Sequence, residues 1–149
     1  MIARLPVTTA LAELLAAATG TPVGRGRMPL GGAQHYYLLY AVDSTISGAP
    51  FADTHEDASY VYQVTSVSGP NPTVKGSAGT LDQVELMADR ARAAILGRDP
   101  ATGLWANPLT MPGVSVMCRD LDTEPGGTSD PADGIMTYVQ RFKLDLTPA

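Results

Sequence analysis

The sequence predicts one α+β domain, residues 1–149, with a single four-stranded, mostly antiparallel sheet and two helices in the order α-β-β-α-β-β, joined by long loops. Three observations predict it. The chain has 149 residues, the size of one domain. Residues Tyr60–Val67 alternate side chains between two faces, as a strand does. Residues Leu81–Leu96 repeat apolar side chains with a helical period.

The first helix is expected near the N-terminus. Thr8 or Thr9 can cap it, and it extends to about Ala18. Gly20 and Pro22 then stop it. The apolar residues of one helical face are Leu11, Leu14, Leu15 and Ala18.

Four segments are typical of strands because they are rich in β-branched and aromatic residues. They are Gln34–Val42, Ser59–Val67, Val114–Leu121 and Met136–Thr147. Glycine and proline mark the segments between them as loops. The long loops expected are Thr21–Ala33, Asp43–Ala58 and Ser68–Gly79.

The second helix carries the clearest end signals. Thr80 and Gln83 have the spacing of a capping box, and Asp82 lies in the first turn, where the helix dipole favours an acid. Gly97 predicts a left-handed stop. The apolar stripe is Val84, Met87, Ala88, Ala91 and Ile95.

The charge of the chain is −5, from 15 acids against 10 lysines and arginines, so the sequence does not support a basic surface for duplex DNA. Nine of the acids lie in two segments without a base. They are Asp43, Asp53, Glu56 and Asp57, and then Asp120, Asp122, Glu124, Asp130 and Asp133. These segments are either solvated loops or a surface that repels nucleic acid or faces a basic partner.

The sequence predicts no catalytic apparatus, cofactor or metal site. Cys118 is the single cysteine, which excludes an internal disulfide. His35 and His55 match no metal-ligand spacing, and the acids from Asp120 onward have proline where a calcium loop needs glycine and glutamate. No apolar run approaches the ~18–20 residues of a membrane span, so we expect no membrane association.

Three segments carry a resemblance to a known family. They are Tyr60–Val67 (YVYQVTSV), Leu81–Leu96 (LDQVELMADRARAAIL) and Phe142–Ala149 (FKLDLTPA). The chain from Gln34 onward resembles the tail terminator proteins of long-tailed, siphovirus-type bacteriophages with actinobacterial hosts. The shared pattern is a "YQVTSVG"-like strand, a helix with the spacing Q-A-x-x-x-A-D-x-[VA]-R-x-A-[IL]-L, and a final strand ending in a "TPA"-like tail.

The resemblance implies a homo-oligomeric ring, usually a hexamer, on the head-proximal end of the tail tube. Such a ring halts tube polymerisation, joins the tail to the head–neck proteins and lets DNA pass without specific binding. It implies a virion protein of the tail–neck junction, made in the cytoplasm of the host bacterium. A head-to-tail ring uses two different patches of each protomer, and the two acidic segments are the candidates for the channel or the ring contacts.

Two alternatives stay open from the sequence. One is a neck or head-completion connector in the same virion. The other is a small enzyme or ligand-binding domain with a pocket near His35 and Cys118.

Overall fold

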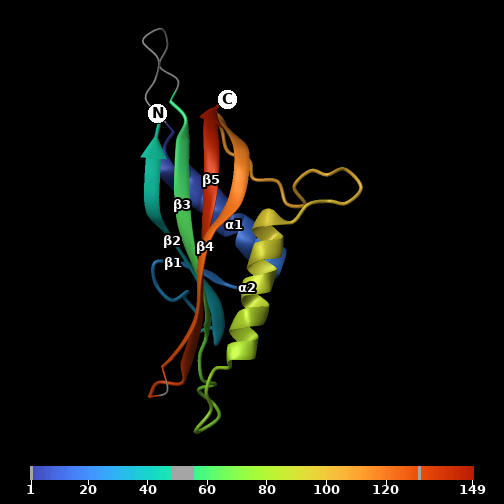
Figure 1. Ribbon diagram of the computed structural model, residues 1–149. Coiled ribbons are helices and arrows are strands. Elements are labelled where there is room, and N and C mark those ends of the chain that lie inside the picture. The colour runs from blue at the N-terminus through green and yellow to red at the C-terminus, as the bar shows by residue number, and fades with distance from the viewer. Residues whose placement is uncertain (1, 48–55, 131) are drawn as a thin grey trace.

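Two helices and five strands make up the part of the chain that the computed structural model describes, residues 2–47, 56–130 and 132–149. Both helices lie on one side of a single sheet, so the molecule has two layers (Figure 1). The elements are α1 (Arg4–Thr19), β1 (Val23–Arg25), β2 (His35–Ile46), β3 (Ala58–Ser68), α2 (Leu81–Leu96), β4 (Val114–Asp130) and β5 (Ile135–Pro148).

The sheet corrects the prediction of four mostly antiparallel strands. It is five-stranded and mixed, in the order β1-β2-β3-β5-β4. The additional strand, β1, pairs parallel to β2, with Val23 opposite Tyr37, and every other neighbouring pair is antiparallel. Because β1 has only three residues within a glycine-rich segment, it carries no detectable alternation. Its pairing depends on α1 returning the chain to the edge of β2.

The third predicted strand continues far beyond Leu121. β4 extends to Asp130 and pairs with β5 across three register shifts. The segment that reads as an acidic loop is therefore mostly strand. Proline and glycine at 125–127 suggested a loop, but in an antiparallel ladder such residues also occur at bulges, which interrupt the pairing without ending it.

The helix ends agree only partly with the sequence signals. Thr80 caps α2 as predicted, its side chain accepting from the backbone N–H of Gln83 at 3.1 Å. The reciprocal half of the capping box is wrong, because the backbone N–H of Thr80 donates to Oγ of Ser68 at 3.3 Å instead. The predicted cap of α1 at Thr8 or Thr9 is wrong, because α1 begins at Arg4 after an uncapped Ala3. Pro6 is tolerated since the first helical turn needs no backbone donor there.

Gly97 ends α2 for a reason other than the predicted left-handed conformation. Its φ is −63°, an ordinary value. A Cβ at this position would lie 2.2 Å from the carbonyl oxygen of Ala93. Glycine is therefore required by the close approach of two backbone segments.

The core lies between the sheet and the two helices. On β3, Tyr60, Tyr62 and Val64 face the helices, and their partners on β5 include Leu144 and Phe142. The predicted stripe of α2 packs on this layer, and all five of its members are buried. The predicted alternation of β3 is therefore confirmed.

Within the described residues, neither helix is long and apolar enough to cross a membrane.

Tyr37 joins the sheet to α2 by a buried hydrogen bond, its hydroxyl donating to the carbonyl oxygen of Met87 at 2.7 Å. We predict that Tyr37→Phe lowers the free energy of unfolding by about 1 kcal/mol, because the phenolic hydroxyl and its hydrogen bond to Met87 are lost without a compensating contact. Burial raises the pKa of Tyr37 to about 12 from 10. Because the pKa is higher in the folded protein, the stabilisation by the Tyr37 hydroxyl is fully present below pH 10 and is lost as the pH rises towards 12.

Urea unfolding between pH 7 and 12 measures both effects. Tyr36→Phe is the control, because the Tyr36 hydroxyl has no hydrogen-bond partner among the described residues. Equal stability of the two variants at pH 7 would contradict the prediction. So would a Tyr37→Phe variant that loses as much stability between pH 10 and 12 as the natural chain does.

Candidate functional site

The described acids of the first acidic segment lie on β2 and directly before β3. Asp43 is exposed on β2, and Glu56 and Asp57 directly precede β3. Asp53 lies outside the described residues, as does His55. Asp57 is exposed, and its carbonyl oxygen accepts a hydrogen bond from the backbone of Ser47. The exposed carboxylates of Asp43 and Asp57 are therefore available to a partner.

The second acidic segment follows the length of β4, so its carboxylates are spread out. Asp120 accepts a hydrogen bond from Cys118, and Glu124 accepts one from the amide of Gln140. Asp130 caps the β4–β5 turn, accepting from the backbone of Ala132 and Asp133. Asp122 is exposed. The structure therefore does not gather the predicted acids into one cluster.

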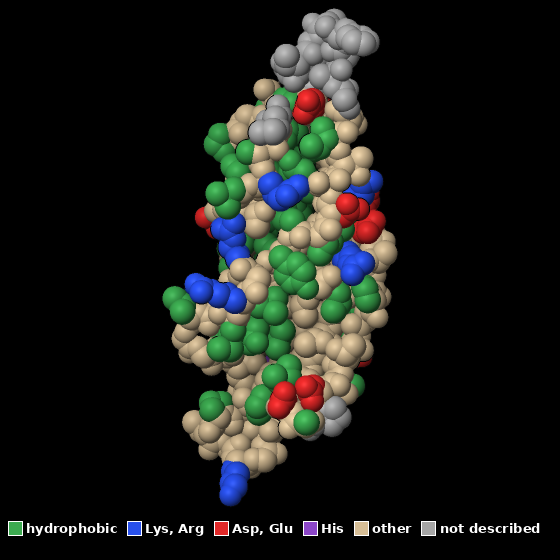
Figure 2. All heavy atoms as spheres, turned by 90° about the vertical axis from the view of Figure 1, so that its left-hand side faces the viewer, with side chains coloured by type: hydrophobic (Ala, Val, Ile, Leu, Met, Phe, Trp, Pro, Cys, Tyr) green, Lys and Arg blue, Asp and Glu red, His purple; other side chains and the backbone are tan. Residues whose placement is uncertain are grey.

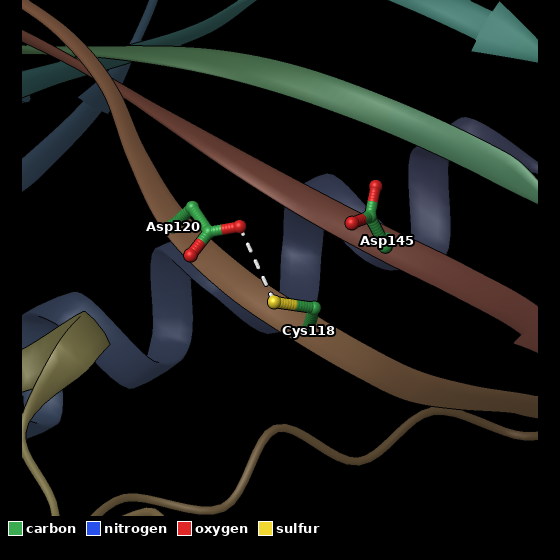
Figure 3. A group of neighbouring side chains, drawn as sticks. All are labelled: Cys118, Asp120 and Asp145. Carbon is green, nitrogen blue, oxygen red and sulfur yellow. Dashed lines mark hydrogen bonds between the residues drawn. The ribbon is translucent and has the colours of Figure 1, made fainter.

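One small group of possible metal ligands forms where β4 and β5 pair. Cys118, Asp120 and Asp145 each offer an atom, and these atoms lie within 4.8 Å of one another (Figure 3). Sequence reasoning missed the group because Asp145 is brought in by strand register, opposite Cys118. Ser59 donates to Asp145, and Lys143 lies 3.7 Å from it.

The Cys118 thiol is held in its neutral form. Its Sγ donates to Oδ2 of Asp120 at 3.2 Å, and this bond, with partial burial and the nearby carboxylates, raises the pKa of the thiol. Metal binding and nucleophilic attack both require the thiolate. With the thiol neutral, the group contains one hydrogen-bonded pair, Cys118 with Asp120, and Asp145 beside it accepts from Ser59 instead.

The sheet ends in two different free edges. β1 covers β2 only from Tyr37 to Leu39, so among the described residues the stretch from Tyr40 to Ile46 pairs on one side alone. Tyr40, Val42 and Ile46 are exposed there. Figure 2 shows the molecule from the left-hand side of Figure 1, where β2 lies. On this face, apolar side chains gather between scattered charges. This β2 edge is therefore an exposed and mainly apolar surface that also carries the carboxylate of Asp43.

The opposite edge is β4, which pairs only with β5 within the described chain. Its three register shifts interrupt the ladder, and Met117 is exposed. The segment between α2 and β4 lies beside it (Figure 1). Bulges and short strands at an edge restrict which chains can pair with it.

A hollow of about 480 Å³ lies beside this β4 edge. Its walls are mainly apolar, and both Trp105 and Arg119 of β4 contribute to them. The residues lining it include Leu104, Leu109, Met111, Val114 and Val116. We call it the Trp105 hollow.

Arg119 is buried, with only 4% of its surface exposed. Its Nη1 donates to the carbonyl oxygens of Ile95 and Asn107, at 3.1 and 2.9 Å. Its Nε is buried without a partner among the described residues. Arg119 and Arg98 both stack on the Trp105 ring, at 4.8 and 3.9 Å from its centre. Sequence reasoning missed this site, because a single arginine in a strand gives no signal of burial.

The pocket near His35 and Cys118, expected in one alternative, does not form. β3 and β5 lie between the strands that carry these residues. His35 shares the helix-covered face with Tyr37, whereas Cys118 lies opposite Asp145 on the other face.

No protein-family profile matches the chain, and a search of curated proteins finds no match. A function must therefore be argued from the residues and their arrangement.

The neutral state of Cys118 predicts slow alkylation. Asp120→Asn removes the carboxylate that raises the thiol pKa, so at pH 8 we expect iodoacetamide to react several-fold faster with the variant than with the natural chain. Rates measured from pH 7 to 10 by mass spectrometry give both pKa values. Asp122→Asn is the control, and equal rates for the natural chain and Asp120→Asn would contradict the prediction.

Proposed function

We propose that the chain is a structural subunit of a bacteriophage tail. It forms a ring that caps the head-proximal end of the tail tube, stops tube polymerisation and joins the tail to the head–neck proteins. The partners are further copies of the chain, the tail tube protein and the neck proteins. DNA passes through the ring without specific binding.

The observation that supports this most is a pair of unlike free edges on the two sides of the sheet: the part of β2 that β1 leaves unpaired, and β4. A closed ring with a head-to-tail contact needs two different patches on each subunit. The apolar β2 edge and the bulged β4 edge supply two such patches.

The strand directions also fit a ring. β2 and β5 run in one direction, and β3 and β4 run in the other. If the axis of the ring is parallel to the strands, the rotation that relates one subunit to the next leaves the strand directions unchanged. It would therefore bring β2 of one copy antiparallel to β4 of the next, which is the commoner form of strand pairing.

The acidic residues support a passage for DNA by their sign. The chain carries a charge of −5, and like charges prevent the phosphate contacts that hold DNA in place. Asp43, Asp57 and Asp122 are exposed carboxylates that can face a channel or a neighbour. The resemblance of the chain from Gln34 onward to tail terminator proteins supports this position in the virion.

We predict that Val42→Lys prevents ring formation. Val42 is 40% exposed on the β2 edge, and a lysine enclosed in an interface there costs about 3–5 kcal/mol without a partner. Native mass spectrometry and negative-stain imaging of the purified protein measure the effect. The matched control is Val74→Lys, at a 53% exposed valine between β3 and α2.

Rings of the natural chain and the control, with subunits only from Val42→Lys, support the edge contact. Rings from Val42→Lys would exclude the β2 edge from the contact. A natural chain that stays monomeric at every concentration would contradict the ring.

Tail tubes provide the test of function. We expect the protein, added to polymerising tube subunits, to stop elongation and to leave a ring at one end of each tube in electron micrographs. The length distribution measures the arrest, and Val42→Lys is the inactive control. Unchanged elongation together with binding to portal-side proteins would replace the tail terminator assignment with that of a neck connector.

A further inference from the structure

We propose that the Trp105 hollow is a binding site for a carboxylate attached to an apolar body. Arg119 receives the carboxylate, and the apolar part lies against Trp105, Leu109, Met111 and Val114. All residues that line the hollow belong to one subunit, so the site can be tested without the ring.

The first argument is the missing anion. Arg119 is almost fully buried, yet no carboxylate among the described residues forms a salt bridge with it or with Arg98. Buried charges in proteins are normally paired, because removing a guanidinium from water is costly. A bound carboxylate would supply the missing partner.

The second argument is what the existing contacts leave unsatisfied. Nη1 caps the last turn of α2 at Ile95, and the negative end of the helix dipole offsets part of the charge. Arg98, on the same indole ring, adds a second positive charge. Nε has no acceptor in the part of the chain that the structure describes, and a carboxylate can accept from two guanidinium nitrogens at once.

The third argument is the shape and lining of the hollow. About 480 Å³ is the size of a small-ligand pocket, and its walls are mostly aliphatic and aromatic. Leu104, at the rim, is 68% exposed. A lining of this kind selects a ligand with an apolar body, whereas Arg119 selects its charge.

Trp105 is the single tryptophan of the chain, so its fluorescence reports on the hollow directly. The probes are hexanoate and 3-phenylpropionate, each titrated beside its neutral amide. We expect a saturable change with the acids and at least about tenfold weaker binding of the amides. Equal binding of acid and amide, or no saturable change with either acid, would overturn the proposal.

Variants separate a ligand role for Arg119 from a merely structural one. Arg119→Met should abolish the preference for acid over amide, and Arg119→Lys should keep part of it. Arg92→Met, at an exposed arginine of α2, is the matched control and should keep all of it. If Arg119→Met does not fold, Arg98→Met should still weaken the preference several-fold. An unchanged preference in Arg98→Met and Arg119→Lys would overturn the proposal.

The carboxylate can be a free acid or an acidic side chain of a neighbouring copy, and a second measurement distinguishes these sources. Native mass spectrometry is repeated with saturating hexanoate. Dissociation of rings identifies a neighbour's side chain as the natural occupant, and an unchanged assembly identifies a free acid. The fluorescence titration does not require rings, so it tests the carboxylate site even if the chain proves not to form a ring.

Discussion

The antiparallel pairing of β3 with β5 is the interaction on which the rest of the subunit depends. It runs without interruption from Ala58 opposite Leu146 to Ser68 opposite Met136. Its register places Tyr62 beside Phe142 beneath the helices, and both side chains are fully buried. Aromatic residues bury large areas, so this layer is the floor on which both helices pack. A register slip of one residue would turn these side chains to the uncovered face.

That central pairing also decides where the sheet can meet another chain. β2 and β4 flank it, and neither is fully covered on its outer side among the described residues. The β2 edge is apolar, and the β4 edge is bulged and lies beside the Trp105 hollow. The two sides of the subunit therefore differ, which favours contacts between unlike patches over a twofold dimer.

Acidic and basic side chains are placed differently in the subunit. Acids occupy exposed positions along β4 and near the start of β3, where water solvates them and several serve in local turns and hydrogen bonds. The positive charge of Arg119 is buried instead, between the end of α2 and Trp105. Exposed carboxylates along β4 repel anions, whereas Arg119, which forms no salt bridge among the described residues, would attract one.

The sequence by itself determined the elements whose signals are local. The alternation of Tyr60–Val67 and the cap at Thr80 depend on neighbours within a few residues, and both appear as expected. Only the tertiary structure decided β1, the extension of β4 and the burial of Arg119, because each depends on partners distant in the chain. Three residues at Val23 form a strand only beside Tyr37, and Arg119 is enclosed only once α2 and Trp105 pack over it. The sequence shows that acids are concentrated between Asp120 and Asp133, but their separation along a strand follows from the pairing of β4 with β5.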